Sequence, residues 1–274
     1  MAAKRKSSPR RSTRAGGLRN LYRRWRSRSN TLSDTLWSEA LRSSAYARVL
    51  PPDDRARLRE LTAQVLRAKF LEGAAGFKVT EPVRARIALH AVIPVLHLGL
   101  DYYADWSSIV IYPGDFRVHD EYMDEHGIVH REIMDLCGQS MSQGPIVLSW
   151  EAMREEDETP GDHDLVIHEC AHKLDLLNGD ANGFPPLHPD MDTRAWARDF
   201  RAAYQRLCAG LGSDAAGAGR IDPYAAEDPA EFFAVMSETF FTNPHLVYEI
   251  HPTVYKQLQR FYRQDPVRYI ESAR

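Results

Sequence analysis

The segment DLVIHECAHKLDLLNG holds two histidines and a glutamate at a spacing that suits metal-dependent hydrolysis. His168 and His172 are four residues apart, so on a helix both imidazoles lie on one face and can bind the same metal ion. Glu169 follows the first histidine and is placed to take a proton from a water molecule that the metal polarises. This H-E-x-x-H pattern predicts a zinc hydrolase, above all a metallopeptidase.

The residues around the motif predict the helix that must present it. Residues 159–162 indicate a turn with an N-cap, and Asn178 followed by Gly179 indicates the C-terminal end. Apolar side chains lie nearly all round the helix between them, which is typical of a buried helix. Because buried polar side chains need partners, a metal site is preferred to the alternative, in which both histidines only hydrogen-bond to backbone carbonyls.

Lengths and patterns along the chain predict an α+β fold. Helical spacing covers residues 36–71, with a break at 51–54, and a further helix begins at Pro82. Strands are predicted at 77–80, 107–112, 128–133 and 144–150, and helices at 196–207, 229–241 and 252–264. The strands lie mid-chain with helices before and after, which favours α+β. We expect one domain over residues 31–274, whose portion at about 31–100 is helical.

Charge is distributed unevenly. Residues 1–30 hold eleven Lys/Arg and no acid, which leaves 24 basic and 38 acidic residues elsewhere, a formal balance of −14. The acidic remainder argues against a nucleic-acid-binding surface on the folded part. Residues 1–30 are expected to be a disordered basic arm, solvated in preference to binding nucleic acid or an anionic membrane.

The cysteines and the apolar stretches indicate in which cellular compartment the protein is expected. The three cysteines are scattered and odd in number, so they form neither a disulfide framework nor a Cys-x-x-Cys knuckle. This usage favours a reducing compartment. The longest apolar stretch, residues 87–100, is too short to span a membrane and contains Pro94, and the N-terminus lacks the apolar core of a secretory signal. A cytoplasmic protein is expected, and His90 and His97 within this stretch are expected to be core or surface residues.

A catalytic zinc ion usually takes three protein ligands, so one is missing from the motif. A metzincin would have glycine and histidine where this chain has Asp175 and Asn178, and no glutamate stands at 190–192, where a thermolysin-like site would place one. Asp192 nevertheless stays a candidate. Asp175 is also a candidate to orient a ligand imidazole through its free N–H, the alternative being a surface carboxylate that pairs with Lys173.

Glu231 is the best remaining candidate for the third ligand. It lies near the start of a sharply defined helix, with Asp228 as N-cap and Pro229 in the first turn. The alternative is a capping box, in which Glu231 bonds back to the N-cap backbone. Glu238 lies two turns further on the same face and is a candidate ligand or a partner of one.

Several separated motifs resemble the Mlc titration factor A family of zinc-dependent peptidases. They are HECAHKLD followed by NGD, then DPY and DPAEFFAV, with IVIYPGDF and GPIVLSW upstream, and together they cover roughly residues 36–241. The resemblance implies a zincin-like fold and one zinc ion per chain, held by His168, His172 and Glu231, with Glu169 as general base. Cys170 departs from the pattern, because aromatic or apolar residues are more usual there.

The site is also similar to that of the peptidase domain of anthrax lethal factor, where a tyrosine seven residues before the ligand glutamate assists catalysis. Tyr224 stands at that spacing and is a candidate catalytic residue, the alternative being a surface tyrosine packed by Pro223. The expected function is a zinc-dependent, aminopeptidase-like enzyme on short peptides, with a transcriptional repressor as partner by resemblance. The alternative is a zinc-stabilised regulatory protein with vestigial hydrolysis. The strand at 144–150 is either an edge that pairs with an extended peptide or an ordinary interior strand.

Overall fold

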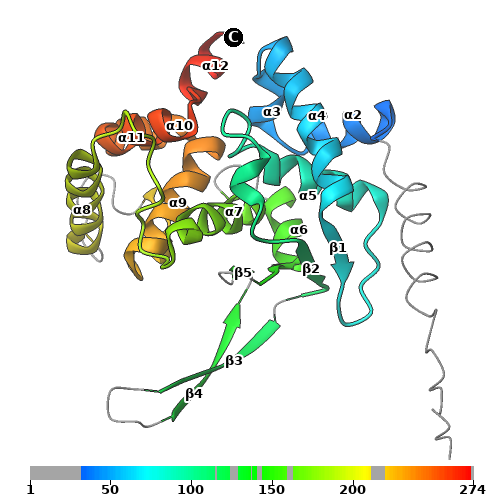
Figure 1. The fold of residues 1–274 in the computed structure, drawn as a ribbon, viewed down its shortest axis with the longest axis horizontal. Helices are drawn as coiled ribbons and strands as arrows, with labels where there is room; N and C mark the ends of the chain where they lie inside the picture. The colour runs from blue at the N-terminus through cyan, green and yellow to red at the C-terminus, as the bar shows by residue number, and fades with distance from the viewer. Residues whose placement is uncertain are drawn as a thin grey trace, which may run out of the picture. The chain divides into compact units, whose positions relative to one another are not determined.

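Figure 1 shows the structure, a computed structural model that describes residues 32–114, 116–123, 129–136, 138–140, 144–158, 163–210 and 220–272. Only the backbone is described for 116–123, 129–136, 138–140 and 157–158. The expected basic arm at 1–30 lies outside these residues, so its disorder and the domain boundary beside it stay predictions. No described helix is long and apolar enough to cross a membrane.

Helices make up the N-terminal part of the described chain: α2 (Asp34–Arg42), α3 (Ala45–Val49), α4 (Pro52–Ala68) and α5 (Glu81–Val92). The hydroxyls of Ser33 and Ser44 cap α2 and α3 by accepting backbone N–H groups of the first turn. Prolines stand in the first turns of α4 and α5; the one in α5 was predicted, whereas Pro52 was expected to belong to a break between helices. Residues 36–71 therefore hold three helices and not two, because Ser44 starts a short additional one.

The main sheet has the strand order β1-β2-β6-β5. Its members are β1 (Phe70–Gly73), β2 (Ser108–Tyr112), β6 (Ile146–Ser149) and β5 (Gly138–Ser140). The first three are parallel, with Leu71 beside Ile109 and Ile109 beside Ile146, whereas β5 is antiparallel to β6. The strands predicted at 107–112 and 144–150 are confirmed, and β6 pairs on both sides, so it is interior.

A second, two-stranded sheet consists of β3 (Phe116–Met123) and β4 (Val129–Leu136), which pair antiparallel. The strand predicted at 128–133 is confirmed within β4, whereas β3 was not predicted.

Two local predictions are wrong. Residues 77–80 form no strand; the strand is β1, in a place where the helical pattern was expected to continue to Leu71. Lys69 already has extended backbone angles, and the ladder with β2 holds the next residues, so a partner almost forty residues away overrides the local preference. Helix α6 (Trp150–Glu158) was also missed, although its alanine, methionine, arginine and glutamates are strong helix formers.

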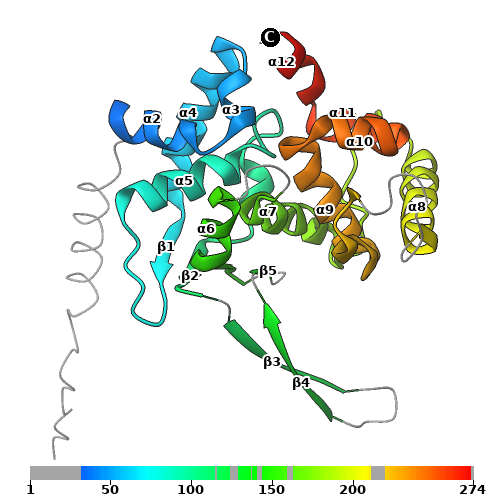
Figure 2. The same ribbon diagram turned by 180° about the vertical axis from the view of Figure 1, so that it is seen from behind.

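Helix α7 (Leu165–Asp175) lies between α5 and α9 (Pro229–Thr242) and contacts both, as Figures 1 and 2 show. Strand β5 contacts α7 as well. The other predicted C-terminal helices are confirmed as α8 (Thr193–Gly210) and α11 (Pro252–Tyr262). Further short elements are η1 (Leu100–Tyr103), η2 (Leu176–Asn178), η4 (Pro223–Ala226), α10 (Pro244–Ile250) and α12 (Pro266–Ser272). The described fold is thus mostly helical, with a small, largely parallel sheet.

An aromatic cluster fixes the position of α9. Trp196 of α8 stacks on Phe200 with ring centroids 4.2 Å apart, and its ring also meets Phe233 of α9 and Phe261 of α11. All four side chains are buried. Each buried aromatic ring contributes roughly 1.5–3 kcal/mol relative to an exposed one. The packing of three helices around this cluster therefore holds α9 in a defined place.

Candidate metal centre

Helix α7 presents both motif histidines in a buried setting. Asp164 is its N-cap, with Oδ1 accepting the N–H of Ile167, and the apolar sequence that follows faces the core. The helix is therefore confirmed, although its cap stands two residues later than the turn expected at 159–162, which the structure does not describe. His168 and His172 lie one turn apart and are only 8% and 9% exposed.

Helix α9 brings Glu231 to the same place. Asp228 caps this helix by accepting the N–H groups of Ala230 and Glu231. The capping-box alternative required the Glu231 carboxylate to accept the backbone N–H of Asp228. The carboxylate faces the two imidazoles instead. Its Oε2 lies 3.1 Å from Nε2 of His168 and 3.2 Å from Nε2 of His172.

The three side-chain atoms fit one divalent cation. The two Nε2 atoms lie 3.1 Å apart, so all three pairwise distances are 3.1–3.2 Å. Ligand atoms about 2.0–2.1 Å from a tetrahedral zinc ion lie about 3.3 Å from one another. His168, His172 and Glu231 form the one group of histidine, cysteine or acidic side chains among the described residues with this convergence. Two imidazoles and one carboxylate are also the donor set of catalytic zinc sites.

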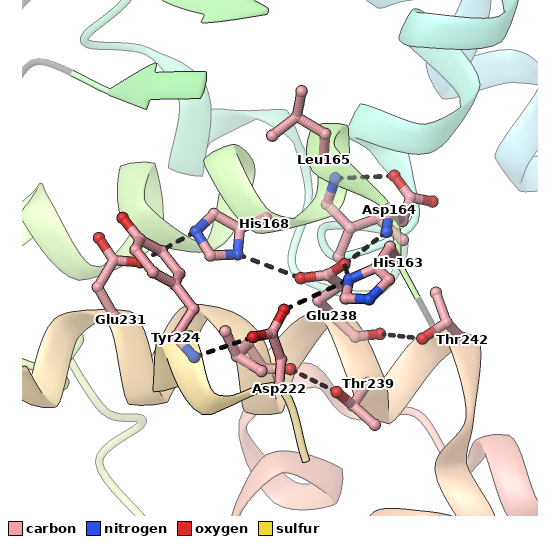
Figure 3. Close-up of polar contacts among 12 residues, drawn as sticks. His163, Asp164, Leu165, His168, Asp222, Tyr224, Glu231, Glu238, Thr239 and Thr242 are labelled. Carbon is pink, nitrogen blue, oxygen red and sulfur yellow. Dashed lines mark hydrogen bonds and ion pairs between the residues drawn. The ribbon is translucent and has the colours of Figure 1, made fainter. Parts of the chain in front are cut away.

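Glu238 supports one of the imidazoles. Its Oε2 lies 3.1 Å from Nδ1 of His168, and its Oε1 accepts the backbone N–H of Asp164 (Figure 3). Burial raises the pKa of Glu238, but hydrogen bonds from His163 and His168 outweigh it and lower that pKa to about 2. An ionised carboxylate at this place can accept the Nδ1–H of His168, and the Nε2 lone pair would then face the other two converging atoms. Glu238 thus contacts one of the three converging side chains and is not itself among the converging atoms.

Glu169 and Tyr224 lie beside the converging atoms. Glu169 is 3% exposed. Burial lowers the pKa of His168, but hydrogen bonds with Glu231 and Glu238 outweigh it and raise that pKa, with smaller contributions from the charges of Glu238 and Glu169. The ring of Tyr224, on the turn η4, has its centroid 6.2 Å from that of His168 and stands next to Glu231 in Figure 3. Burial, followed by the charge of Glu231 and a hydrogen bond with it, and then by the charge of Glu169, raises the pKa of Tyr224 well above its ordinary value. The phenol therefore stays protonated and is able to donate a hydrogen bond.

Asp175 does not make the contact expected of it. Its carboxylate touches neither imidazole nor Lys173, whose Nζ donates to the carbonyl of Gly144. Asp175 instead accepts three backbone N–H groups from residues 182–184 at 2.7–2.8 Å. This loop abuts the start of α9, since a methyl group added at Gly183 would lie 2.3 Å from the carbonyl oxygen of Pro229. Asp175 thus links the end of α7 to the helix that carries Glu231.

Replacing Asp175 with alanine is expected to lower the free energy of unfolding by about 3–5 kcal/mol, because three N–H groups lose a charged acceptor. Urea denaturation measures the change. Asp180→Ala, an exposed aspartate five residues away, is the matched control and is expected to stay within about 0.5 kcal/mol of the wild type. Equal stability of the two variants would show that the hydrogen bonds of Asp175 to residues 182–184 do not stabilise the fold.

The other sequence candidates lie apart from the converging atoms. Asp192 is exposed and accepts N–H groups at the start of α8. His90 is buried and bonds to Asp164 and Ser43, and His97 pairs with an aspartate of α4. Both histidines therefore have the core or surface roles that were expected.

Sequence reasoning missed His163 and Asp222. His163 precedes the N-cap of α7, and its Nδ1 lies 3.5 Å from Oε1 of Glu238 and 3.7 Å from Oδ2 of Asp222. Asp222 in turn accepts the N–H of Tyr224. The only local signal was the DPY tripeptide, in which an aspartate before proline is typical of a turn start. Nothing in the spacing indicated the contact between residues 163 and 238.

Comparison with known proteins agrees with this geometry. The model of the family described as glucose-regulated metallo-peptidase M90 matches residues 18–263. A protein named Mlc titration factor A from Serratia proteamaculans (strain 568) is 41% identical over 234 residues, which cover 84% of this chain and 87% of the relative. Proteins of the same name from Escherichia fergusonii and Klebsiella pneumoniae (strain 342) are 39% and 38% identical, over 84% and 85% of this chain and 86% and 88% of theirs.

Proposed function

Because the chain belongs to the glucose-regulated metallo-peptidase M90 family, we propose that it is a zinc-dependent peptidase that acts on short peptides from their amino end. The observation that carries this proposal is the convergence of His168, His172 and Glu231 within bonding distance of one cation, with Glu169 beside them. Zinc is the proposed ion, one per chain, since imidazole nitrogens with a carboxylate suit it better than calcium or magnesium. The fold proposed for the site is zincin-like.

Each protein group then has a defined task. When bound, the ion would act as a Lewis acid that polarises the scissile carbonyl and the attacking water. Glu169 takes the proton of the attacking water and passes it to the leaving amine. The Tyr224 hydroxyl donates a hydrogen bond to the oxyanion that forms on the substrate. Glu238 holds the His168 ring in the orientation that the site requires.

The peptide is proposed to pair with β5. The strand at 144–150, one sequence candidate for this role, is excluded because β6 is paired on both sides. Strand β5 ends the described sheet and contacts α7. A peptide that extends the sheet there would run past the metal-binding helix, held by backbone hydrogen bonds that tolerate many side chains.

A free amino end is favoured by the electrostatics around Tyr224. Glu231, Glu169 and Asp228 are all close enough to raise the pKa of its phenol. Because the bound cation offsets the charge of Glu231, the attraction of a substrate ammonium group rests on Glu169 and Asp228, which are not among the converging side chains.

Removal of the metal is expected to abolish hydrolysis. The purified protein should contain one zinc ion per chain and cleave an aminoacyl p-nitroanilide, with activity falling at least about 100-fold after chelation and returning with added zinc. The N-acetylated form of the same substrate should be cleaved poorly. Absorbance of the released nitroaniline and elemental analysis of the protein measure these results. Turnover that is indifferent to chelation would contradict the proposal, and equal cleavage of both substrates would remove its aminopeptidase part.

A second candidate function is regulatory. The relatives are named Mlc titration factor A, which favours binding to a transcriptional repressor. In this case the metal would stabilise the fold and hydrolysis would be vestigial. Tight repressor binding that persists in a Glu169→Gln variant, together with absent peptide turnover in the wild type, would favour this alternative. A cytoplasmic location stays a prediction from composition, and so does the preference for a solvated arm at residues 1–30 over an arm that binds nucleic acid.

A further inference from the structure

The imidazole of His163 lies between two carboxylates, each of which also supports a part of the candidate site. Its Nδ1 is 3.5 Å from Oε1 of Glu238 and 3.7 Å from Oδ2 of Asp222 (Figure 3). The other oxygen of Glu238 contacts Nδ1 of His168 at 3.1 Å. The other oxygen of Asp222 accepts the N–H of Tyr224 at 2.9 Å and so caps the turn η4. One imidazole therefore connects the support of a metal ligand with the support of the candidate oxyanion donor.

His163 is positively charged at neutral pH, so its imidazolium attracts the carboxylates of Glu238 and Asp222. The hydrogen bond with Glu238 is the main cause that raises the pKa of His163 to about 9, against burial, which lowers it. Carboxylates face the ring from three elements, namely Glu238 of α9, Asp222 at the start of η4 and Glu156 of α6. Among the described residues that line the cavity of about 310 Å³ beside them, the one other cation is Arg220, which is paired with Glu249. An imidazolium at neutral pH thus keeps two like-charged carboxylates together.

Tyr224 needs such a support. The turn η4 has four residues and Tyr224 is 47% exposed, so its position depends on the Asp222 cap and on a hydrogen bond between its phenol and Glu231. By contrast, His168 and His172 are fixed by α7, and Glu231 is fixed by α9 with its aromatic packing. An oxyanion donor is effective only within a few tenths of an ångström of its working position.

We propose that His163 is a positioning residue that holds the Asp222 turn against Glu238 and thereby keeps the Tyr224 hydroxyl beside the metal-binding atoms. The catalytic part of this inference rests on the proposed peptidase function, whereas its structural part does not. The competing explanation is that His163 only neutralises Glu238 and has no effect on Tyr224.

A double-mutant cycle separates the two explanations. His163→Gln is expected to lower kcat about 10- to 100-fold with the zinc content unchanged, because a displacement of about 1 Å can have an effect of that size. In a Tyr224→Phe background, the same substitution is expected to have no further effect on kcat, since the hydroxyl that it displaces is gone. An equal loss of kcat in both backgrounds would overturn the proposal.

Three further variants control the chemistry. Asp222→Asn keeps an N-cap acceptor for Tyr224 but removes the charge, so it should reproduce the loss, and it serves also if His163→Gln does not fold. His163→Lys keeps a cation and should restore most of kcat. His97→Gln is the matched control, because His97 pairs with Asp54 at 3.4 Å outside the site and should leave kcat unchanged. Failure of Asp222→Asn to lower kcat would contradict the proposal.

A spectroscopic readout does not depend on turnover. In zinc-loaded protein with ¹³C-labelled histidine and tyrosine rings, the pKa of His163 should be about 9 and should fall in Asp222→Asn. His163→Gln should shift the Tyr224 ring resonance, and His97→Gln should not. Because the imidazolium is lost as pH rises through about 9, the wild-type Tyr224 resonance should move in that range, and the His163→Gln resonance should not. A Tyr224 resonance indifferent to residue 163 overturns the inference even if the wild type shows no hydrolysis, an outcome that would count against the proposed function alone.

Discussion

Glu169→Gln is expected to lower kcat/KM for an aminoacyl p-nitroanilide by about 10²–10⁴-fold, the range typical of a lost general acid–base group. Glutamine has the same size as glutamate but cannot take the proton of the attacking water. Glu169 follows His168 on α7 and is buried, yet it is absent from the three converging side chains. The zinc content should therefore remain one ion per chain. Steady-state kinetics and elemental analysis of the same preparation measure both quantities.

The control for this variant is Glu60→Gln, an identical change at an exposed position of α4. It should leave both the kinetics and the zinc content as in the wild type. Full activity in Glu169→Gln would remove this residue from the mechanism. Loss of zinc from the variant would instead assign Glu169 to the metal ligands, contrary to the geometry.

Glu231→Gln is expected to weaken zinc binding by more than about 100-fold, beyond the 10- to 100-fold effect typical of losing a group that only supports a ligand. Glu231 offers the one carboxylate oxygen that converges with both imidazole nitrogens. Replacing it with an amide removes a negative charge and a strong donor from the ion's surroundings. Competition with a chromogenic chelator measures the dissociation constant.

Glu238→Gln is the matched comparison, because it is the same change seven residues along α9. Its carboxylate contacts the far nitrogen of His168, so zinc binding should weaken by about 10- to 100-fold. The decisive result is the order of the two effects. Tighter zinc binding by Glu231→Gln than by Glu238→Gln would show that the ligand and its supporting carboxylate have been exchanged.

Helix α7 shows how much of the local structure can be predicted from neighbouring residues. The spacing of His168 and His172, and the apolar residues around them, predicted a buried helix with both rings on one face. Asp228 and Pro229 likewise predicted where α9 begins, and Asp228 caps it as expected. Helical periodicity and capping act within about one turn, so they can be read from neighbouring residues.

The identity of the third converging side chain, Glu231, could not be settled from local sequence signals. From the residues alone, Glu231 was the best candidate, but Asp192, Glu238 and a capping role stayed open, and the resemblance to a family then favoured Glu231. The choice depends on how α9 lies against α7, and Glu231 is 63 residues from His168 along the chain. That arrangement is set by packing across the core, including the aromatic cluster around Trp196.

The contacts of Asp175 and His163, which lie around the three converging side chains, were even harder to predict from the sequence. Asp175 was expected to touch an imidazole, but a loop folds back and offers it three N–H groups. The place of His163 between Asp222 and Glu238 has no counterpart in any spacing pattern. The sequence alone identified the helix that carries the histidines, with its start misplaced by two residues, and it gave the correct start of α9 and the residue types that can do the chemistry. Only the tertiary structure decided which distant carboxylates meet the imidazoles, because contacts between helices depend on the fit of side chains throughout the core.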